Sequence, residues 1–96
     1  MSIETFADRK TENLFNGESG HKFATDIVRR AKARLDQINL AADLRDLKVP
    51  PGNRLEALSG DREGQYSIRI NDKWRICFRW EDGDAFDVEV NNHYRV

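Results

Sequence analysis

The sequence predicts an α+β fold in which two N-terminal helices pack on one face of a small, mostly antiparallel sheet. In the first half of the chain apolar residues recur every three or four positions, whereas beyond residue 50 they alternate with polar ones. Pro50, Pro51 and Gly52 mark the change of period because they end helical structure. At 96 residues the chain is expected to form a single domain over residues 1–96.

The clearest element of the first half is an amphipathic helix from about residue 22 to residue 40. Its apolar positions share one face and are Phe23, Ile27, Ala31, Leu35 and Ile38. Before this helix, residues 2–6 alternate polar and apolar and predict a short strand. Residues 7–16 predict a short helix that ends at Gly17, and a further short turn is expected at residues 44–47.

Three antiparallel strands are predicted after the prolines. The residues expected to point inward are Tyr66, Ile68, Ile70, Trp74, Ile76, Phe78, Trp80, Phe86, Val88 and Val90. Because facing residues of paired strands point to the same side of a sheet, a three-residue loop at 71–73 sets Arg69 opposite Arg75. A second three-residue loop at 81–83 sets Arg75 opposite Glu89. The helices then cover the apolar face, and the polar face is expected to be open.

The predicted polar face carries a row of charged side chains. Its members are Ser67, Arg69, Arg75, Cys77, Arg79, Asp87, Glu89 and Asn91. Arg69 opposite Arg75 is the strongest feature, because like charges that face each other on a sheet are mildly destabilising and favour a compensating anion. Two interpretations remain open. Asp87 and Glu89 complete an exposed ladder of ion pairs, which the pattern slightly favours, or the arginines form an anion-binding surface.

Composition and spacing argue against several kinds of site. A single cysteine, Cys77, cannot form an intramolecular disulfide or a Cys-rich zinc site, and the two histidines lack ligand spacing, so neither metal nor cofactor is expected. No signal-peptide pattern or run of 18 apolar residues is found, so no membrane contact is expected and the predicted location is cytoplasmic. With a net charge of -1, a nucleic-acid site has to be a local basic patch.

Two further groups of side chains have alternative interpretations. His93 and Tyr94 directly follow the last predicted strand, where an imidazole and a phenol are suited to proton transfer, or they belong to a frayed tail. The long helix carries a basic cluster, which is more often a solvated face than a docking surface for a partner. The members of this cluster are Arg29, Arg30, Lys32 and Arg34.

The segment from residue 50 to residue 94 resembles the HigB toxins, also called plasmid maintenance system killer proteins, of the RelE superfamily. The matching features are Leu-x-x-Leu-x-Gly-x-Arg-x-Gly-x-x-Ser-Ile over residues 55–68, Asn-Asp-x-Trp-Arg-Ile-x-Phe over residues 71–78, and Gly83-Asp84 before a strand that leads to a His/Tyr tail. The N-terminal half is similar too, with an opening strand, a Leu-Phe pair near Gly17 and a helix that ends in Ala-Ala-Asp-Leu-Arg-Asp-Leu. The resemblance therefore covers nearly the whole chain.

This resemblance implies a RelE-like microbial RNase fold and a toxin of a type II toxin-antitoxin system. Such a toxin is expected to be a ribosome-dependent endoribonuclease that cleaves mRNA in the A site and inhibits translation, with the RNA 2′-hydroxyl attacking the adjacent phosphate. The alternative is a weakly or non-catalytic co-repressor that binds the antitoxin. The implied partners are a HigA-like helix-turn-helix antitoxin, the ribosome and mRNA, with operator DNA reached only through the antitoxin.

The resemblance also implies roles for individual residues. Arg75 matches the family's strand arginine and is expected to clamp the phosphate, and Arg62 matches its loop arginine. The tail differs from the family's Asp-Tyr-His, since residues 92–94 read Asn-His-Tyr, and Glu56 and Ser59 stand where some members carry His and Lys. The expected site residues are Arg62, Arg75, His93 and Tyr94 for catalysis, and Arg69, Lys73 and Asn92 for RNA binding.

Overall fold

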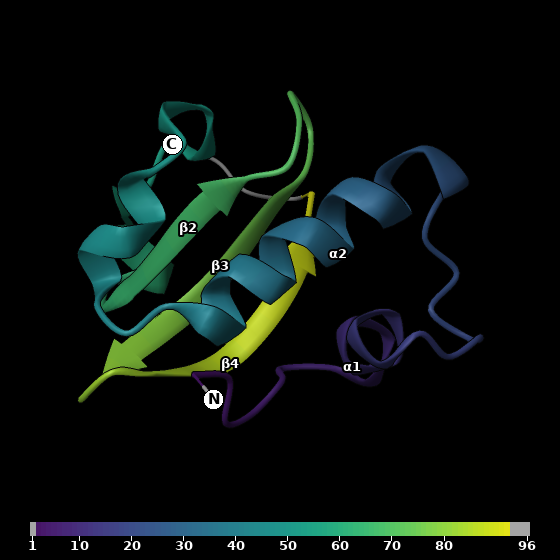
Figure 1. The fold of residues 1–96 in the computed structure, drawn as a ribbon, viewed down its shortest axis with the longest axis horizontal. Coiled ribbons are helices and arrows are strands. Elements are labelled where there is room, and N and C mark those ends of the chain that lie inside the picture. The colour runs from purple at the N-terminus through teal and green to yellow at the C-terminus, as the bar shows by residue number, and fades with distance from the viewer. Residues whose placement is uncertain (1, 93–96) are drawn as a thin grey trace.

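The computed structural model describes residues 2–92, in which helix α2 crosses one face of a four-stranded sheet (Figure 1). The helices are α1 (Arg9–Asn16) and α2 (Thr25–Leu40), and the strands are β1 (Glu56–Ala57), β2 (Gln65–Arg69), β3 (Arg75–Glu81) and β4 (Asp84–Asn91). Three 3₁₀ turns connect them: η1 (Leu44–Lys48), η2 (Pro51–Asn53) and η3 (Gly60–Arg62). The strands are antiparallel in the order β1-β2-β3-β4, which confirms the predicted α+β fold.

Both helices follow from local sequence signals. The carboxylate of Asp8 accepts a hydrogen bond from the Thr11 backbone N–H (2.8 Å) and caps α1, and Gly17 ends that helix in the left-handed conformation (φ 75°). Helix α2 begins three residues after the predicted start. The Phe23 N–H donates instead to His21 Nδ1 (3.0 Å), so this segment forms a turn outside the helix. Within residues 2–92 neither helix is long and apolar enough to cross a membrane.

The hydrophobic core lies between α2 and the sheet. The predicted apolar stripe of α2 is buried, as are the inward residues of the strands: Phe23, Ile27, Ala31, Leu35, Ile38, Ile68, Ile76, Phe78 and Val88. Phe78 is the largest fully buried side chain, and its ring lies 6.3 Å from the rings of both Tyr66 and Trp80. One face of the sheet and one stripe of the helix therefore supply the core, as their periodicities predict.

The outer edge of β4 is covered by the N-terminal part of the chain. Residues 2–6 do not form the predicted strand but make two isolated parallel bridges, Ile3 to Ala85 and Phe6 to Val88. Further along, the buried Thr11 hydroxyl accepts a hydrogen bond from Val90 N (3.0 Å), so α1 continues the cover. Because an uncovered edge strand invites pairing with other chains, this arrangement protects the sheet.

The hairpin between β2 and β3 has the predicted register. Arg69 pairs with Arg75, and Ser67 pairs with Cys77 on the same face. Two arginines therefore leave adjacent strands at one end of the sheet, next to the loop of residues 71–73.

The turn between β3 and β4 is shorter than predicted. It contains two residues, Asp82 and Gly83, since Glu81 pairs directly with Asp84. Both turn residues have positive φ (51° and 87°), as a type I′ hairpin requires. Asp-Gly is a common sequence for such a turn, so the expectation of a three-residue loop was wrong.

A bulge in β4 changes the pairing beyond this turn. Asp87 adopts φ 55° at the register shift that separates Cys77 from Arg79 on the facing strand. The shorter turn and the bulge each move the pairing by one residue, so Arg75 lies opposite Asn91, and the predicted pairing of Arg75 with Glu89 is wrong. Glu89 faces Cys77 instead.

The two-residue turn reverses the orientation predicted for Phe86. Phe86 pairs with Arg79, whose guanidinium lies 5.5 Å from the centre of its ring, whereas the prediction placed Phe86 in the core. Ala85, opposite Trp80, takes the inward position and is fully buried. The bulge then returns Val88 to the core, where it is fully buried.

Candidate anion-binding site

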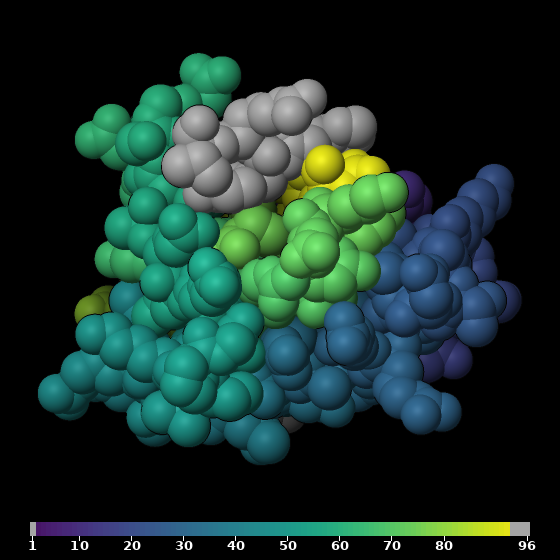
Figure 2. Space-filling view, turned by 90° about the horizontal axis from the view of Figure 1, so that it is seen from above, coloured from purple at the N-terminus to yellow at the C-terminus, as the bar shows by residue number. Residues whose placement is uncertain are grey.

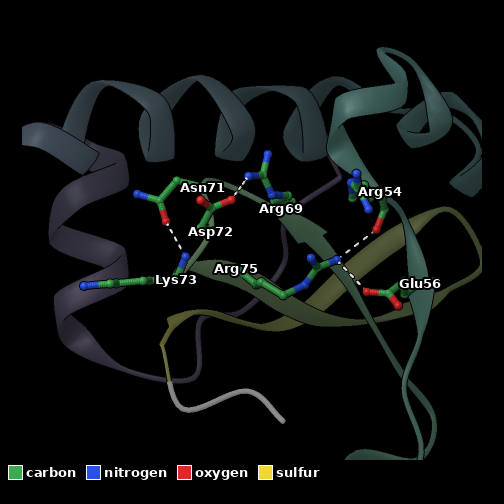
Figure 3. A pocket seen from close by; sticks show the side chains of 7 residues that line it. All are labelled: Arg54, Glu56, Arg69, Asn71, Asp72, Lys73 and Arg75. Atoms are coloured by element: carbon green, nitrogen blue, oxygen red, sulfur yellow. Dashed lines mark hydrogen bonds and ion pairs between the residues drawn. The ribbon is translucent and has the colours of Figure 1, made fainter. Parts of the chain in front are cut away.

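A cleft of about 390 Å³ lies between the β2–β3 loop and the segment that leads into β1. Its walls carry the seven side chains drawn in Figure 3: Arg54, Glu56, Arg69, Asn71, Asp72, Lys73 and Arg75. Four of them are cationic and two are acidic, so the cleft is positive although the whole chain has a formal charge of -1. The predicted site residues Arg69, Lys73 and Arg75 therefore share one cleft.

The Arg75 side chain is held by three acceptors among the described residues. Its Nε donates to Ser67 Oγ (2.8 Å), and its Nη2 donates to the Arg54 carbonyl (2.8 Å) and lies 3.0 Å from Glu56 Oε1. Only 11% of the side chain is exposed. Because a planar guanidinium held at both Nε and Nη2 has little freedom to rotate, Arg75 is fixed before any anion binds.

The Arg54 carbonyl is placed by the loop before β1. Arg54 adopts the left-handed conformation (φ 48°) at the end of η2. The preceding Asn53 is fully buried, and its amide nitrogen donates to the carbonyls of Leu47 (3.2 Å) and Val49 (3.4 Å). This buried amide holds η1 and η2 together, so a backbone oxygen reaches the arginine of β3.

The opposite wall of the cleft is the β2–β3 loop. Asn71 Oδ1 accepts hydrogen bonds from the backbone N–H groups of Lys73 (2.9 Å) and Trp74 (2.8 Å), which closes the loop as an Asx turn. Trp74 packs edge-on against Phe23 at 5.6 Å and ties the loop to the start of α2. Lys73 is exposed at the rim, and Arg69 forms an ion pair with Asp72.

Glu56 occupies the place beside Arg75 that an incoming anion needs. Its carboxylate lies 3.0 Å from Arg75 Nη2, and 42% of its side chain is exposed. Because the Glu56 carboxylate is partly exposed to solvent, water screens this ion pair and a stronger anion can compete for Arg75. The cleft is therefore a candidate anion site in which the Glu56 carboxylate competes for Arg75.

Glu56→Gln is expected to tighten the binding of inorganic phosphate about fivefold, because it removes the competing charge while keeping the shape of the side chain. Titration of the protein with phosphate, followed by the NMR signals of the β2–β3 loop, measures this change. Glu18→Gln, which removes the same charge at an exposed position after α1, serves as the control. Unchanged or weaker phosphate binding in Glu56→Gln would contradict competition.

Arg62 lies outside the cleft but on the same face of the sheet. Its Nη1 donates to Gln65 Oε1 (2.9 Å), and its Nη2 lies 3.2 Å from Glu89 Oε1. The positive charges of Arg62 and Arg75 both act to lower the pKa of the fully buried Cys77 thiol. Arg62 therefore neighbours the phosphate-clamp candidate without touching the cleft.

The centre of the polar face is covered and not open as predicted. Ser67 and Cys77 are both fully buried, and the Arg75 side chain lies on the Ser67 hydroxyl. Burial raises the pKa of the Cys77 thiol, while Arg62 and Glu89 act on it in opposite directions. The thiol therefore stays protonated near neutral pH and is not a nucleophile.

The other end of the same face is a ladder of ion pairs. Arg79 Nε lies 2.9 Å from Asp87 Oδ2, and Arg79 also pairs with Glu81. The hydrogen bond with Asp87 raises the pKa of the Arg79 guanidinium. The ion-pair ladder is thus found at the β3–β4 turn, and the cleft at the β2–β3 loop remains the candidate anion-binding site.

With this geometry established, comparisons with known proteins identify the family. Residues 4–93 match the model described as RelE-like toxin of type II toxin-antitoxin system HigB. The chain belongs to the HigB-like toxin family. It is 34% identical over 94 residues to Toxin HigB-1 of Vibrio cholerae serotype O1, covering 97% of this chain and 98% of that protein. It is 29% identical over 92 residues to Endoribonuclease HigB of Proteus vulgaris, covering 96% and 99%.

A solved structure supports the fold of this HigB-like toxin. The YoeB-YefM complex from Staphylococcus aureus contains a chain that matches with a TM-score of 0.61 and 16% sequence identity, covering 98% of this chain and 100% of that one. At this identity the likeness bears on the fold alone. It confirms the RelE-like architecture that the sequence predicts.

Three predicted site residues of the toxin lie at or beyond the end of the described chain. His93 and Tyr94 are outside residues 2–92, and Asn92 is an exposed bend residue after β4 that does not line the cleft. Among the described residues, no group of three or more His, Cys, Asp or Glu side chains is placed to hold a metal ion.

Four residues that line the cleft were not predicted from the sequence: Arg54, Glu56, Asn71 and Asp72. Asn71 offered a signal, because Asn in a short hairpin loop commonly closes an Asx turn. The sequence carries no signal for the role of Arg54. Its backbone carbonyl accepts the hydrogen bond from Arg75, and every residue type has a backbone carbonyl.

Proposed function

We propose that this toxin is a ribosome-dependent endoribonuclease that cleaves mRNA in the ribosomal A site and so inhibits translation. The observation that carries the proposal is the fixed Arg75 guanidinium in a positive cleft. The relative from Proteus vulgaris that is named an endoribonuclease supports the reaction class.

In the proposed reaction the RNA 2′-hydroxyl oxygen forms a bond to the adjacent phosphorus and the bond from phosphorus to the 5′-oxygen breaks. The 2′-hydroxyl proton passes to a base, an acid protonates the leaving 5′-oxygen, and the products are a 2′,3′-cyclic phosphate and a 5′-hydroxyl. Arg75 donates to the non-bridging oxygens as negative charge builds on them, and as a fixed donor it needs no reorganisation at that moment. His93 and Tyr94 are the proposed proton-transfer groups.

The other cations are assigned to binding. Arg69 and Lys73 line the same cleft as Arg75, where they attract the phosphates that flank the reacting one. Arg62 keeps its predicted role in catalysis, to which it contributes positive potential from the neighbouring part of the face, and Asn92 is assigned to RNA contact at the end of β4. A local patch is sufficient because the ribosome, and not the toxin, holds the message.

The proposed partners follow from membership of a toxin-antitoxin family. A HigA-like helix-turn-helix antitoxin neutralises the toxin and carries it to operator DNA, and toxin, ribosome and message meet in the cytoplasm. No cofactor or metal is assigned to the reaction. The alternative role is a weakly or non-catalytic co-repressor that binds the antitoxin, and for that role little or no RNA cleavage is expected.

The deciding experiment adds the purified toxin to a translating extract and, in parallel, to the same mRNA without ribosomes. Mapping of RNA 5′ ends is expected to show cuts at A-site codons, with 5′-hydroxyl ends, in the translating extract. No such cuts are expected in the ribosome-free mRNA. Equal cutting of ribosome-free mRNA would contradict ribosome dependence. Arrest of translation in the extract without any cut would contradict the nuclease and favour a binding role.

A further inference from the structure

Helix α2 is hydrogen-bonded to both walls of the cleft from positions about one turn apart. On one side Arg34 Nε donates to the Arg69 carbonyl at the end of β2 (3.2 Å). On the other side Gln37 Oε1 accepts a hydrogen bond from the amide nitrogen of Asn53 (3.0 Å). Figure 2 shows the green β2–β3 hairpin and the teal segment around η2 side by side, next to blue α2. Arg34 is thus a structural member of the basic cluster on α2, and one helix is tied to both walls.

A chain of contacts runs from Gln37 to the guanidinium of Arg75. Asn53 is fully buried, and its amide nitrogen also donates to two carbonyls at the end of η1. Arg54 follows directly, and its carbonyl accepts the hydrogen bond from Arg75 Nη2 (2.8 Å), as Figure 3 shows. The position of that carbonyl is therefore set by the Asn53 side chain, which is itself held by α2.

The segment that places this carbonyl has two features that cost stability. Asn53 Oδ1 is buried and has no hydrogen-bond partner among the described residues, which is rare and unfavourable for a buried oxygen. Arg54 adopts φ 48°, a left-handed conformation that a residue with a side chain seldom takes. Features of this kind concentrate at functional sites, where the surrounding structure holds them in place. Here their shared result is an acceptor beside Arg75.

We infer that Gln37 and Asn53 are positioning residues for the Arg75 phosphate clamp. Neither lines the cleft, but together they fix the acceptor that holds Arg75 Nη2. A guanidinium held at both ends presents its donors in one orientation, and such donors stabilise a transition state without reorganising. When the Arg54 carbonyl is free to move, Arg75 keeps its charge but loses this orientation. The inference rests on the proposed function in one respect, that Arg75 meets the phosphate to be cleaved.

The first measurement is the NMR spectrum of the Arg75 guanidinium in the free toxin. Firmly bound Nη groups rotate slowly and give separate proton signals, whereas mobile ones give one averaged signal. Gln37→Met removes the acceptor for Asn53 at similar side-chain length, and its Nη signals are expected to average at a lower temperature than in the wild type. Gln37→Glu keeps an oxygen acceptor and is expected to give the wild-type spectrum. Unchanged Arg75 signals in Gln37→Met, or averaged signals already in the wild type, would overturn the inference.

The second measurement is the rate of A-site cleavage with toxin in excess over ribosomes that hold the message. Asn53→Ala is expected to lower the maximal rate about tenfold and Gln37→Met about threefold, because a misplaced group costs most in the transition state. The toxin concentration that gives half of the maximal rate is expected to stay close to the wild-type value in both. Gln37→Glu is expected to cleave like the wild type. If Asn53→Ala fails to fold, the two Gln37 variants carry the test, and equal rates in them would overturn the inference.

Leu14→Val separates positioning from a general loss of stability. Leu14 is buried in α1, which lies on the far side of the molecule from the teal segment around η2 (Figure 1). This variant is expected to lower the melting temperature and to leave the Arg75 signals and the cleavage rate of the folded toxin unchanged. Changes as large as those in Gln37→Met would show general loosening and overturn the inference. A wild type that cuts no message, with Arg75 still loosened in Gln37→Met, would reject the nuclease proposal and leave Gln37 and Asn53 as positioning residues of Arg75.

Discussion

Arg75→Ala is expected to lower A-site cleavage about 100-fold or more and to relieve growth arrest. Loss of one fixed donor to the oxyanion of a transition state typically costs about 100- to 1,000-fold in rate, and Arg75 is the cation that the structure holds most firmly in the cleft. The measurement is the yield of new RNA 5′ ends in a translating extract, with growth after induction as a second readout. Toxicity equal to the wild type would contradict the assigned site.

Two matched variants separate charge from geometry in this experiment. Arg79→Ala removes an arginine from the same strand and face, but one that pairs with Asp87 in the ladder, and it is expected to leave cleavage close to normal. Arg75→Lys keeps the charge but loses the planar fork, so an intermediate rate is expected. Because Glu56 and Ser67 lose their partner in Arg75→Ala, a thermal melt of each variant checks that the fold is retained.

The spacing of apolar residues along the chain predicted the parts of the fold in which one face of a helix or strand is buried. The apolar stripe of α2 and the placement of Arg69 opposite Arg75 were both right, because burial of one face leaves little choice of register. The prediction for the second hairpin failed for two local reasons. The two-residue turn at Asp82-Gly83 was missed although Asp-Gly is typical of it. A bulge at Asp87 requires a positive φ at a residue other than glycine, which no pattern in the sequence indicates.

The candidate site was predictable only in its cations. Arg75, Arg69 and Lys73 follow from the hairpin register and the resemblance, and the structure brings them to one cleft. The position of Glu56 beside Arg75 could not be predicted. Strand β1 has two residues, and its pairing with β2 is too short to leave a periodic pattern in the sequence. The acceptors that fix Arg75 thus come from a segment whose geometry depends on the packing of η1 and η2.

The two phenylalanines of the second hairpin test the register directly. Phe78→Ala is expected to lower the free energy of unfolding by about 3–5 kcal/mol, because it leaves a cavity beneath α2 where the largest buried side chain stood. Phe86→Ala is expected to cost about 1 kcal/mol or less, because Phe86 is only half-buried and packs under the Arg79 guanidinium on the opposite face.

Denaturant unfolding of both variants beside the wild type measures the difference. A loss of 3–5 kcal/mol is a large part of the stability of a small domain, so the midpoint for Phe78→Ala is expected to fall far below that for Phe86→Ala. Equal losses would indicate that Phe86 points inward, and the two-residue turn and the bulge at Asp87 would then both be wrong. Since the turn and the bulge together set Asn91, and not Glu89, opposite Arg75, the same comparison tests which β4 side chain faces the proposed phosphate clamp.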